Sequence, residues 1–93
     1  MTTKSTSIKF SEAKKHFGKA LRKSRENQGL SQGQVATALM LKGAQYISNI
    51  ERGVSLPSLP ILGCLVKQYS LNREGILDAY TRVMKLKFRE EMQ

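Results

Sequence analysis

The sequence predicts an all-α domain of five helices with an extended C-terminal helix. The first observation is a series of residues whose side chains can accept from the free backbone N–H groups that begin a helix: Ser11, Ser31, Ser58 and Asn72. Each is followed by apolar residues spaced three and four apart, which is the helical period. Gly29 and Gly53 stand where two of these patterns end, as glycine often does after a helix.

The charge of the chain favours an anionic partner. The 93 residues, enough for one domain, include 16 Lys and Arg against 7 Asp and Glu, giving a net charge of +9 and a pI near 10.1. Residues 1–30 hold eight of these cations and two acids, so this third alone carries +6 of the +9. A small domain this basic is typical of proteins that bind nucleic acid.

The sequence lacks residues that several classes of function require. The single cysteine, Cys64, excludes an internal disulfide and suits a reducing cytoplasm, and no apolar run approaches the roughly 18 residues of a membrane span. No His/Cys cluster has metal spacing, and no glycine-rich phosphate loop is present. We therefore expect no enzyme, no catalytic residue, no metal and no cofactor, with His16 exposed and Cys64 a small core residue.

Residues 1–10 are expected to form a flexible arm, and residues 11–81 the folded domain. Phe10 precedes the predicted cap Ser11, as a hydrophobic staple would. The first helix should end at Gly29, with Leu30 folding back onto the core. Its predicted inward residues are Phe17, Ala20, Leu21 and Ser24.

Two short helices joined by a tight turn are predicted between Ser31 and Arg52. Ser31 and Gln34 match a capping box, and Gly43 is the predicted cap of the second helix, residues 44–52. The first of the two has an apolar stripe of Val35, Ala36 and Leu39, and the second turns Ile47 and Ile50 inward. The residues on the opposite face of the second helix are Gln45, Ser48, Asn49 and Arg52.

The fourth helix should follow an extended link, because the residue before Pro57 avoids the helical region. Ser58 is its predicted cap, and a proline at position 60 is tolerated in the first turn. It should end near Ser70. Its predicted core-side residues are Leu59, Leu62, Leu65, Val66 and Tyr69.

The last helix, from Arg73, is longer than a minimal domain requires. Its apolar stripe is Ile76, Leu77, Tyr80, Val83, Met84 and Phe88. We expect residues 82–93 to extend beyond the core and to serve dimerisation, since exposed apolar stripes indicate a partner surface. The alternative is that the helix folds back on its own domain near Phe10. The candidate dimer-interface residues are Tyr80, Val83, Met84 and Phe88.

Five motifs along the chain are informative together: Leu21-Arg22-x-x-Arg25, Gly29-Leu30-Ser31-Gln32, Val35-Ala36, Gln45-Tyr46-Ile47-Ser48-Asn49-Ile50-Glu51-Arg52-Gly53 and Pro57-Ser58-Leu59. With these motifs the sequence resembles the Xre/Cro/phage-repressor type of helix-turn-helix. The resemblance covers about Phe17 to Leu77 and is specific as an ensemble rather than motif by motif. It implies a five-helix, lambda-repressor-like domain that binds operator DNA, usually as a dimer.

The resemblance implies a role for each matching residue. Gln45 and Asn49 match base-facing positions, where an amide can donate and accept on adenine N6/N7. Ser48 and the small Ala44 lie beside them, Ala44 suited only to a thymine methyl. The expected phosphate contacts are Gln32, Lys42 and Arg52. Tyr46 is expected to pack against Leu41, and its hydroxyl is a further candidate for a phosphate contact.

The resemblance also implies an internal ion pair between Arg25 and Glu51, which would tie the first helix to the third. The alternative is two independent surface charges. One departure from the family pattern is Met40, where the turn usually opens with glycine. A second is a turn one residue longer than in the shortest members.

The sequence therefore favours a sequence-specific, double-stranded-DNA-binding transcriptional regulator. We expect a homodimer on a palindromic site, in the cytoplasm and nucleoid-associated when bound. The alternative is an antitoxin-like or other protein-binding module with the same fold, in which Leu86 and Phe88 hold a non-identical protein partner. A third and weaker possibility is binding of DNA or RNA through charge alone, irrespective of sequence.

Overall fold

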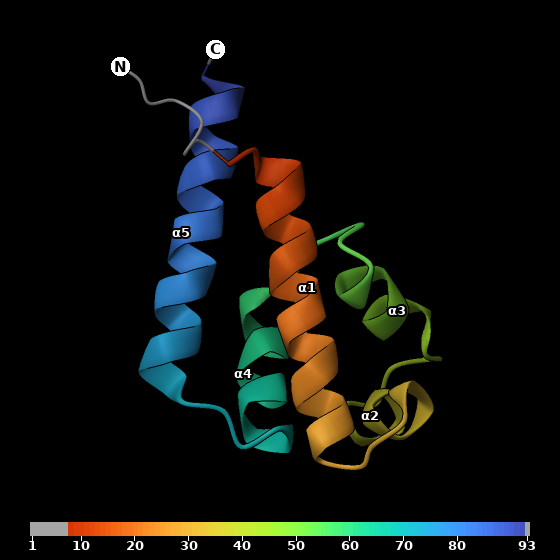
Figure 1. Cartoon of the computed structure of the whole chain (residues 1–93). Coiled ribbons are helices and arrows are strands. Elements are labelled where there is room, and N and C mark those ends of the chain that lie inside the picture. The colour runs from red at the N-terminus through yellow and green to blue at the C-terminus, as the bar shows by residue number, and fades with distance from the viewer. Residues whose placement is uncertain (1–7, 93) are drawn as a thin grey trace.

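The computed structural model describes residues 8–92, and within that range it contains five helices and no strand (Figure 1). The all-α prediction is confirmed. Residues 1–7, most of the predicted arm, and residue 93 lie outside the described range. The helices are α1 (Phe10–Asn27), α2 (Gln32–Ala38), α3 (Gln45–Glu51), α4 (Leu59–Gln68) and α5 (Arg73–Glu91).

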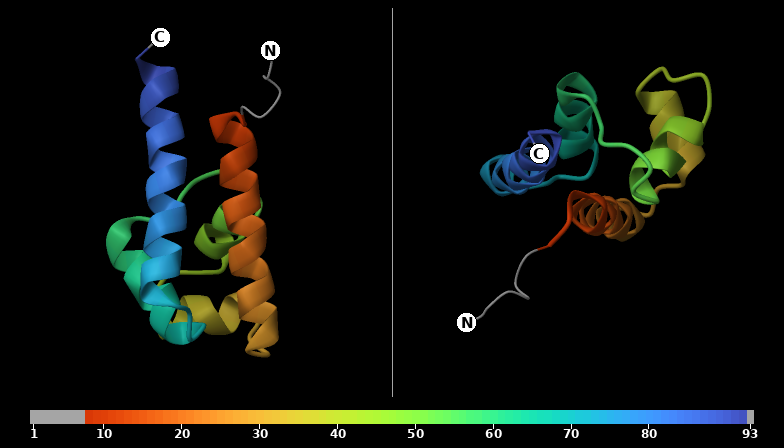
Figure 2. Two further views of the ribbon diagram at one scale, coloured as in Figure 1. Left: turned by 60° about the vertical axis from the view of Figure 1, so that its left-hand side comes forward. Right: turned by 90° about the horizontal axis from the view of Figure 1, so that it is seen from above.

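Helix α1 is the central element of the molecule. Helix α3 packs on one side of it and α5 lies along the other, side by side and antiparallel (Figures 1 and 2). Seen from above, α1, α3, α4 and α5 surround a common interior (Figure 2). The core draws on all five helices, and its largest fully buried side chains are Leu21, Ile47, Ile50, Leu65, Val35 and Pro57. None of the helices in residues 8–92 is long and apolar enough to cross a membrane.

Three of the five predicted helix N-caps are confirmed. The Ser31 hydroxyl accepts from the Gln34 N–H at 3.0 Å while the Gln34 side chain accepts from the Ser31 N–H at 2.8 Å, which completes the capping box. Asn72 Oδ1 accepts from the N–H two residues into α5 at 2.6 Å. Ser58 caps α4 in the same manner. These caps satisfy backbone donors that have no partner inside the helix.

The predicted start of α1 was wrong. The helix begins at Phe10, so Ser11 lies inside its first turn and the N-cap is Lys9. The Glu12 carboxylate accepts from the Lys9 N–H at 3.3 Å and closes this end. The Phe10 N–H donates to Glu90 at 2.7 Å, so a residue far along the chain satisfies a free donor of this end. The residues around Phe10 do not predict this contact, because its partner lies 80 positions away.

Three side chains predicted to lie inward are exposed, and a fourth is only half-buried. Ala20 is exposed and Ser24 half-buried, because the buried side of α1, which packs on both α3 and α5, consists of Ala13, Phe17, Gly18, Leu21 and Arg25. Leu59 is 59% exposed. Cys64 is exposed rather than a core residue, since α4 buries only the side that carries Leu62 and Leu65. His16 is exposed, as predicted.

Helix α5 folds back along α1 over most of its length, so the prediction that its second half extends beyond the core was wrong in part. Val83 is 6% exposed and belongs to the core rather than to a free interface. Tyr80 packs its ring 5.8 Å from that of Phe17 and donates its hydroxyl to the Pro57 carbonyl at 3.0 Å. Only Met84 and Phe88 of the four interface candidates remain exposed, at 36% and 63%.

The backbone of α3 meets α1 at a glycine. A Cβ on Gly18 would clash with the Ile50 carbonyl oxygen and lie 2.8 Å from that of Glu51. Gly53, with φ +76°, has the same role one turn earlier along α1, where its Cβ would lie 2.7 Å from Lys15 Cα. Two helices can approach this closely only where no side chain separates them.

We expect Gly18→Ala to lower the free energy of unfolding by about 2–3 kcal/mol, because the added methyl must push α3 off α1. Gly63→Ala is the matched control, because no atom lies within 4 Å of its would-be Cβ and Gly63 is an exposed residue within α4. That variant should gain about 0.5–1 kcal/mol. Urea denaturation measures the free energy of unfolding of both variants. Equal effects at the two sites would show that α3 does not pack closely enough on Gly18 to exclude a methyl group.

Candidate functional site

Helices α2 and α3 are joined by a turn that opens on a residue in the left-handed region. Met40 has φ +59° and is 92% exposed. The N–H groups of Met40 and Leu41 donate to the carbonyls of Thr37 and Ala36 at 3.0 and 2.8 Å, which closes the end of α2 as a Schellman motif. Glycine is usual at this position because a side chain costs about 1–2 kcal/mol there. Met40, which departs from the family pattern, therefore adopts the backbone conformation that glycine usually takes at this position.

Helix α3 is held at both ends by backbone geometry. Its N-cap is Ala44 rather than the predicted Gly43, and it makes no side-chain cap bond. At the other end the N–H groups of Gly53 and Val54 donate to the carbonyls of Ile50 and Asn49 at 3.1 and 2.9 Å. Glycine is required there by the positive φ of Gly53 and by its approach to α1.

The outward face of α3 carries a small hydrogen-bonded set of polar side chains. Asn49 Oδ1 accepts from Gln45 Nε2 at 2.9 Å and from Arg52 Nη2 at 2.6 Å. Arg52 Nε donates to the Ser48 hydroxyl at 3.2 Å. Gln45 and Arg52 are exposed, and Ser48 and Asn49 are half-buried. The structure therefore brings these four predicted residues onto one accessible face, while Ala44 lies half-buried at its start.

This face offers both donors and acceptors to a ligand. Asn49 keeps its amide N–H groups and Gln45 keeps its amide oxygen, since the bonds within the set use the opposite ends of the two amides. Two amides four residues apart lie one above the other along a helix. An arrangement of this kind can form paired hydrogen bonds to base edges, as Asn and Gln do with adenine.

A buried ion pair fixes α3 to α1, and α2 joins it. Arg25 Nε and Nη2 donate to the two Glu51 oxygens at 2.7 and 3.0 Å, a bidentate geometry, with side chains 9% and 3% exposed. Arg25 Nη1 donates to the Leu30 carbonyl at 2.7 Å, and Gln32 Nε2 donates to Glu51 Oε1 at 2.9 Å. Every element of the helix-turn-helix therefore touches the pair.

The surroundings of the pair shift two pKa values. Hydrogen bonding to Glu51 raises the pKa of Arg25 above its usual value, although burial opposes the shift. Burial raises the pKa of the Tyr69 hydroxyl to about 12, and the Glu51 carboxylate adds to the effect. The Tyr69 hydroxyl is buried and has no hydrogen-bond partner among residues 8–92. Both groups therefore keep their protons at neutral pH.

Cations of α1 gather beside the end of α3. A cleft of about 460 Å³ is lined by Lys15, Lys19 and Arg22 of α1 and by Arg52. Its other lining residues are Glu12, His16 and Glu51, and the Glu51 carboxylate is already paired with Arg25. The sequence shows many cations on the first helix but does not indicate which of them lie beside α3. Their spacing of four and then three residues already placed these three on one side of a helix. Only the packing of α3 against α1 shows which side faces Arg52.

The remaining predicted contact residues differ in how freely they can move. Lys42 is exposed in the turn. Tyr46 is half-buried, and its hydroxyl accepts from the Ser58 N–H at 3.1 Å, so it links α3 to the start of α4. Gln32 is half-buried and its side chain is directed to Glu51. No group of three or more His, Cys, Asp or Glu residues in the described range could hold a metal ion.

Comparison with known proteins identifies the fold and the family. A family model described as helix-turn-helix matches residues 21–70, more than half of the chain. The structure is similar to that of the clp gene regulator ClgR from C. glutamicum, with a TM-score of 0.61 and 25% identity over 87% of this chain and 99% of that one. No curated protein sequence gave a significant match.

We expect the Arg25–Glu51 pair to behave as one buried unit. Glu51→Ala or Arg25→Ala should each lower the free energy of unfolding by about 3–5 kcal/mol, since each leaves an unpaired buried charge. The double variant should cost less than the sum of the two. A double-mutant cycle from urea denaturation measures the difference.

The exposed pair Asp78–Arg82, at 3.1 Å with side chains 66% and 70% exposed, is the matched control. Its coupling energy should stay below about 0.5 kcal/mol, because solvent screens exposed charges. Additive losses at Arg25 and Glu51 would mean that the two act independently despite their contact.

Proposed function

The chain belongs to the Xre/Cro type of the helix-turn-helix family, and on that premise we propose that it is a sequence-specific regulator of transcription that binds double-stranded DNA. The family is one of DNA-binding domains, and its members' function is typically not enzymatic. The observation that carries the proposal is the exposed polar face of α3 beside the basic cleft of α1. The likeness to a gene regulator supports it.

We assign base reading to α3, lying in the major groove. Gln45 is exposed and Asn49 presents its amide N–H groups on the same face, which supports their role as the main base contacts. Ser48 and Ala44 are neighbours on that helix and serve as secondary contacts. The bonds among Gln45, Asn49 and Arg52 hold the face in a defined shape before DNA arrives. Pre-ordering of this kind lowers the entropy lost on binding.

We assign the phosphate contacts to cations on either side of that face. Lys42 lies in the turn before α3, and Arg52 lies at its end with Lys15, Lys19 and Arg22 beside it. The net charge of +9 supplies the long-range attraction that makes such binding depend on salt. Gln32 and the Tyr46 hydroxyl can take part only if they give up, or share, their bonds to Glu51 and Ser58. We rank them below the cations.

We propose a homodimer formed through the outer side of α5, bound to a palindromic site in the cytoplasm. Leu77, Met84 and Phe88 are exposed at positions seven and four residues apart, so they form one stripe on the side of α5 away from the core. A two-fold dimer places the same stripe on both subunits. Half-sites about one helical turn of DNA apart would then match the dimer.

We expect Gln45→Ala to weaken binding to a selected operator by about 1–3 kcal/mol and to leave binding to random duplex nearly unchanged, because a base contact is specific to its site. The operator comes from selection of bound duplexes out of a random pool, and affinities are measured at one fixed salt concentration. Asn27→Ala, an exposed amide at the end of α1, is the control and should change neither affinity. Equal losses on both duplexes would remove Gln45 from the base-reading face.

We expect Phe88→Glu to convert the dimer to a monomer in light scattering, because dimerisation would bury a carboxylate in the apolar stripe. Asn27→Glu changes the net charge equally at an exposed site of α1 and should leave the mass unchanged. The monomer should also bind a palindromic operator more weakly, since half of the contacts are lost. A Phe88→Glu variant with wild-type mass would exclude this stripe as the interface.

A further inference from the structure

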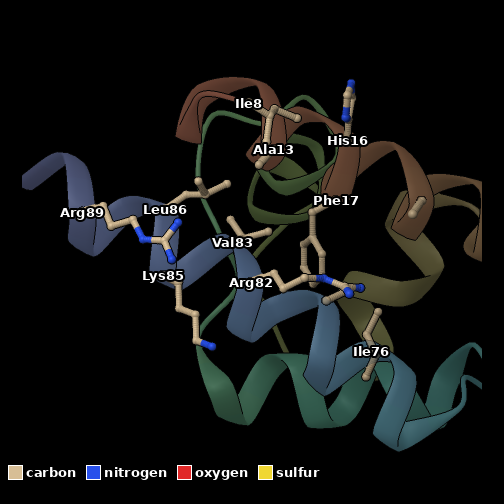
Figure 3. A pocket seen from close by; sticks show the side chains of 12 residues that line it. Ile8, Ala13, His16, Phe17, Ile76, Arg82, Val83, Lys85, Leu86 and Arg89 are labelled. Atoms are coloured by element: carbon tan, nitrogen blue, oxygen red, sulfur yellow. The ribbon is translucent and has the colours of Figure 1, made fainter. Parts of the chain in front are cut away.

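A groove runs between α1 and α5 on a side of the molecule that the DNA-binding proposal does not use. Its volume is about 730 Å³. Phe17 reaches into it from α1, and Val83 and Leu86 reach into it from α5, as Figure 3 shows. Its other apolar lining residues are Ile8, Ala13, Ala20, Ile76 and Ala79, and His16 also lines it.

The groove is long and open rather than enclosed. On α5 its lining residues run from Ile76 to Arg89, 13 positions that correspond to about 20 Å of helix. Three alanines, Ala13, Ala20 and Ala79, leave its two walls low. A long, shallow apolar surface of this kind fits the apolar face of another helix, whereas small molecules prefer sites that enclose most of their surface.

The charges at the edge of the groove have one sign. Arg82, Lys85 and Arg89 line it from α5, and no carboxylate is among its lining residues. The nearest acids are already engaged, since Asp78 pairs with Arg82 at the surface and Glu90 accepts from the Phe10 N–H. The guanidinium groups of Arg82 and Arg89 lie along the groove, while Lys85 points away from it (Figure 3). An occupant with acidic flanks would complement this edge.

We propose that the groove between α1 and α5 docks an acidic amphipathic helix of a partner protein. The apolar face of that helix, with residues at i, i+3, i+4 and i+7, would cover Ala20, Ile76 and Leu86, which keep accessible surface, while Phe17 and Val83 form the buried floor of the groove. The carboxylates of the partner helix would meet Arg82 and Arg89. A second copy of this chain is assigned above to another side of α5, where Leu77, Met84 and Phe88 are exposed. The proposal is independent of DNA reading by α3.

The test is a selection from displayed helical peptides of about 16 residues, randomised at their surface positions and panned against the full chain. The enriched peptides should carry an apolar stripe flanked by Asp and Glu. Ala20→Phe should weaken their binding at least 10-fold, because the exposed alanine lines the groove and the larger side chain fills it. Arg82→Glu and Arg89→Glu should each weaken it about 3- to 10-fold.

The matched control is Lys67→Glu, which makes the same change of charge on an exposed residue of α4 outside the groove and should leave the affinity within about twofold. Circular dichroism and operator binding of each variant show that it is folded. No enrichment of acidic amphipathic peptides, or enriched peptides indifferent to Ala20→Phe, would overturn the proposal.

Two other occupants would also overturn it. If Ala20→Phe alone turns a dimer into a monomer, the groove is the contact between copies of the chain. If decanoate binds the groove more tightly than every selected peptide, and Ala20→Phe abolishes that binding, the groove is a site for small amphipathic anions.

Discussion

The close packing of α3 on α1 is the constraint on which the rest of the molecule depends. Gly18 allows the backbone at the end of α3 to contact α1 directly. About two turns later along α1, the Arg25–Glu51 ion pair connects the same two helices. Because Gln32 also donates to Glu51, the same pair sets the position of α2. A buried pair of this kind contributes little net stability when its desolvation is counted. Its role is to select one orientation of α3.

With α3 in this orientation, one side of a very short helix is buried and the opposite side is accessible. Seven residues cannot form a stable helix alone. Ile47 and Ile50 are fixed in the core on one side, so Gln45 and Arg52 are presented on the other. The strained Met40 at the turn is tolerated for the same reason: tertiary packing of α2 and α3 outweighs its local cost. The base-reading face proposed for α3 therefore depends on packing contacts that extend well beyond α3 itself.

Helix α5 gives the molecule two further surfaces. One side of it packs on α1 through Val83 and Tyr80, and this contact leaves an apolar groove with a basic edge. Another side carries Leu77, Met84 and Phe88 in water. The self-association and the partner docking proposed above would therefore use different sides of the helix that also completes the core. Both surfaces lie on α5, away from the face of α3.

The sequence alone determined what depends on neighbours along the chain. Capping by Ser31 and Asn72, the glycine ends, the helical stripes and the family pattern that pairs Arg25 with Glu51 were all predicted, because each follows from spacing within a few residues or from a pattern that the family shares. The tertiary structure decided what depends on contacts between distant residues: the Phe10–Glu90 bond that helps place the start of α1, the exposure of Ala20, Leu59 and Cys64, and the burial of Val83. The meaning of Gly18 is of this second kind, since a glycine inside a helix reads locally as a weakness and becomes a requirement only when another backbone lies against it.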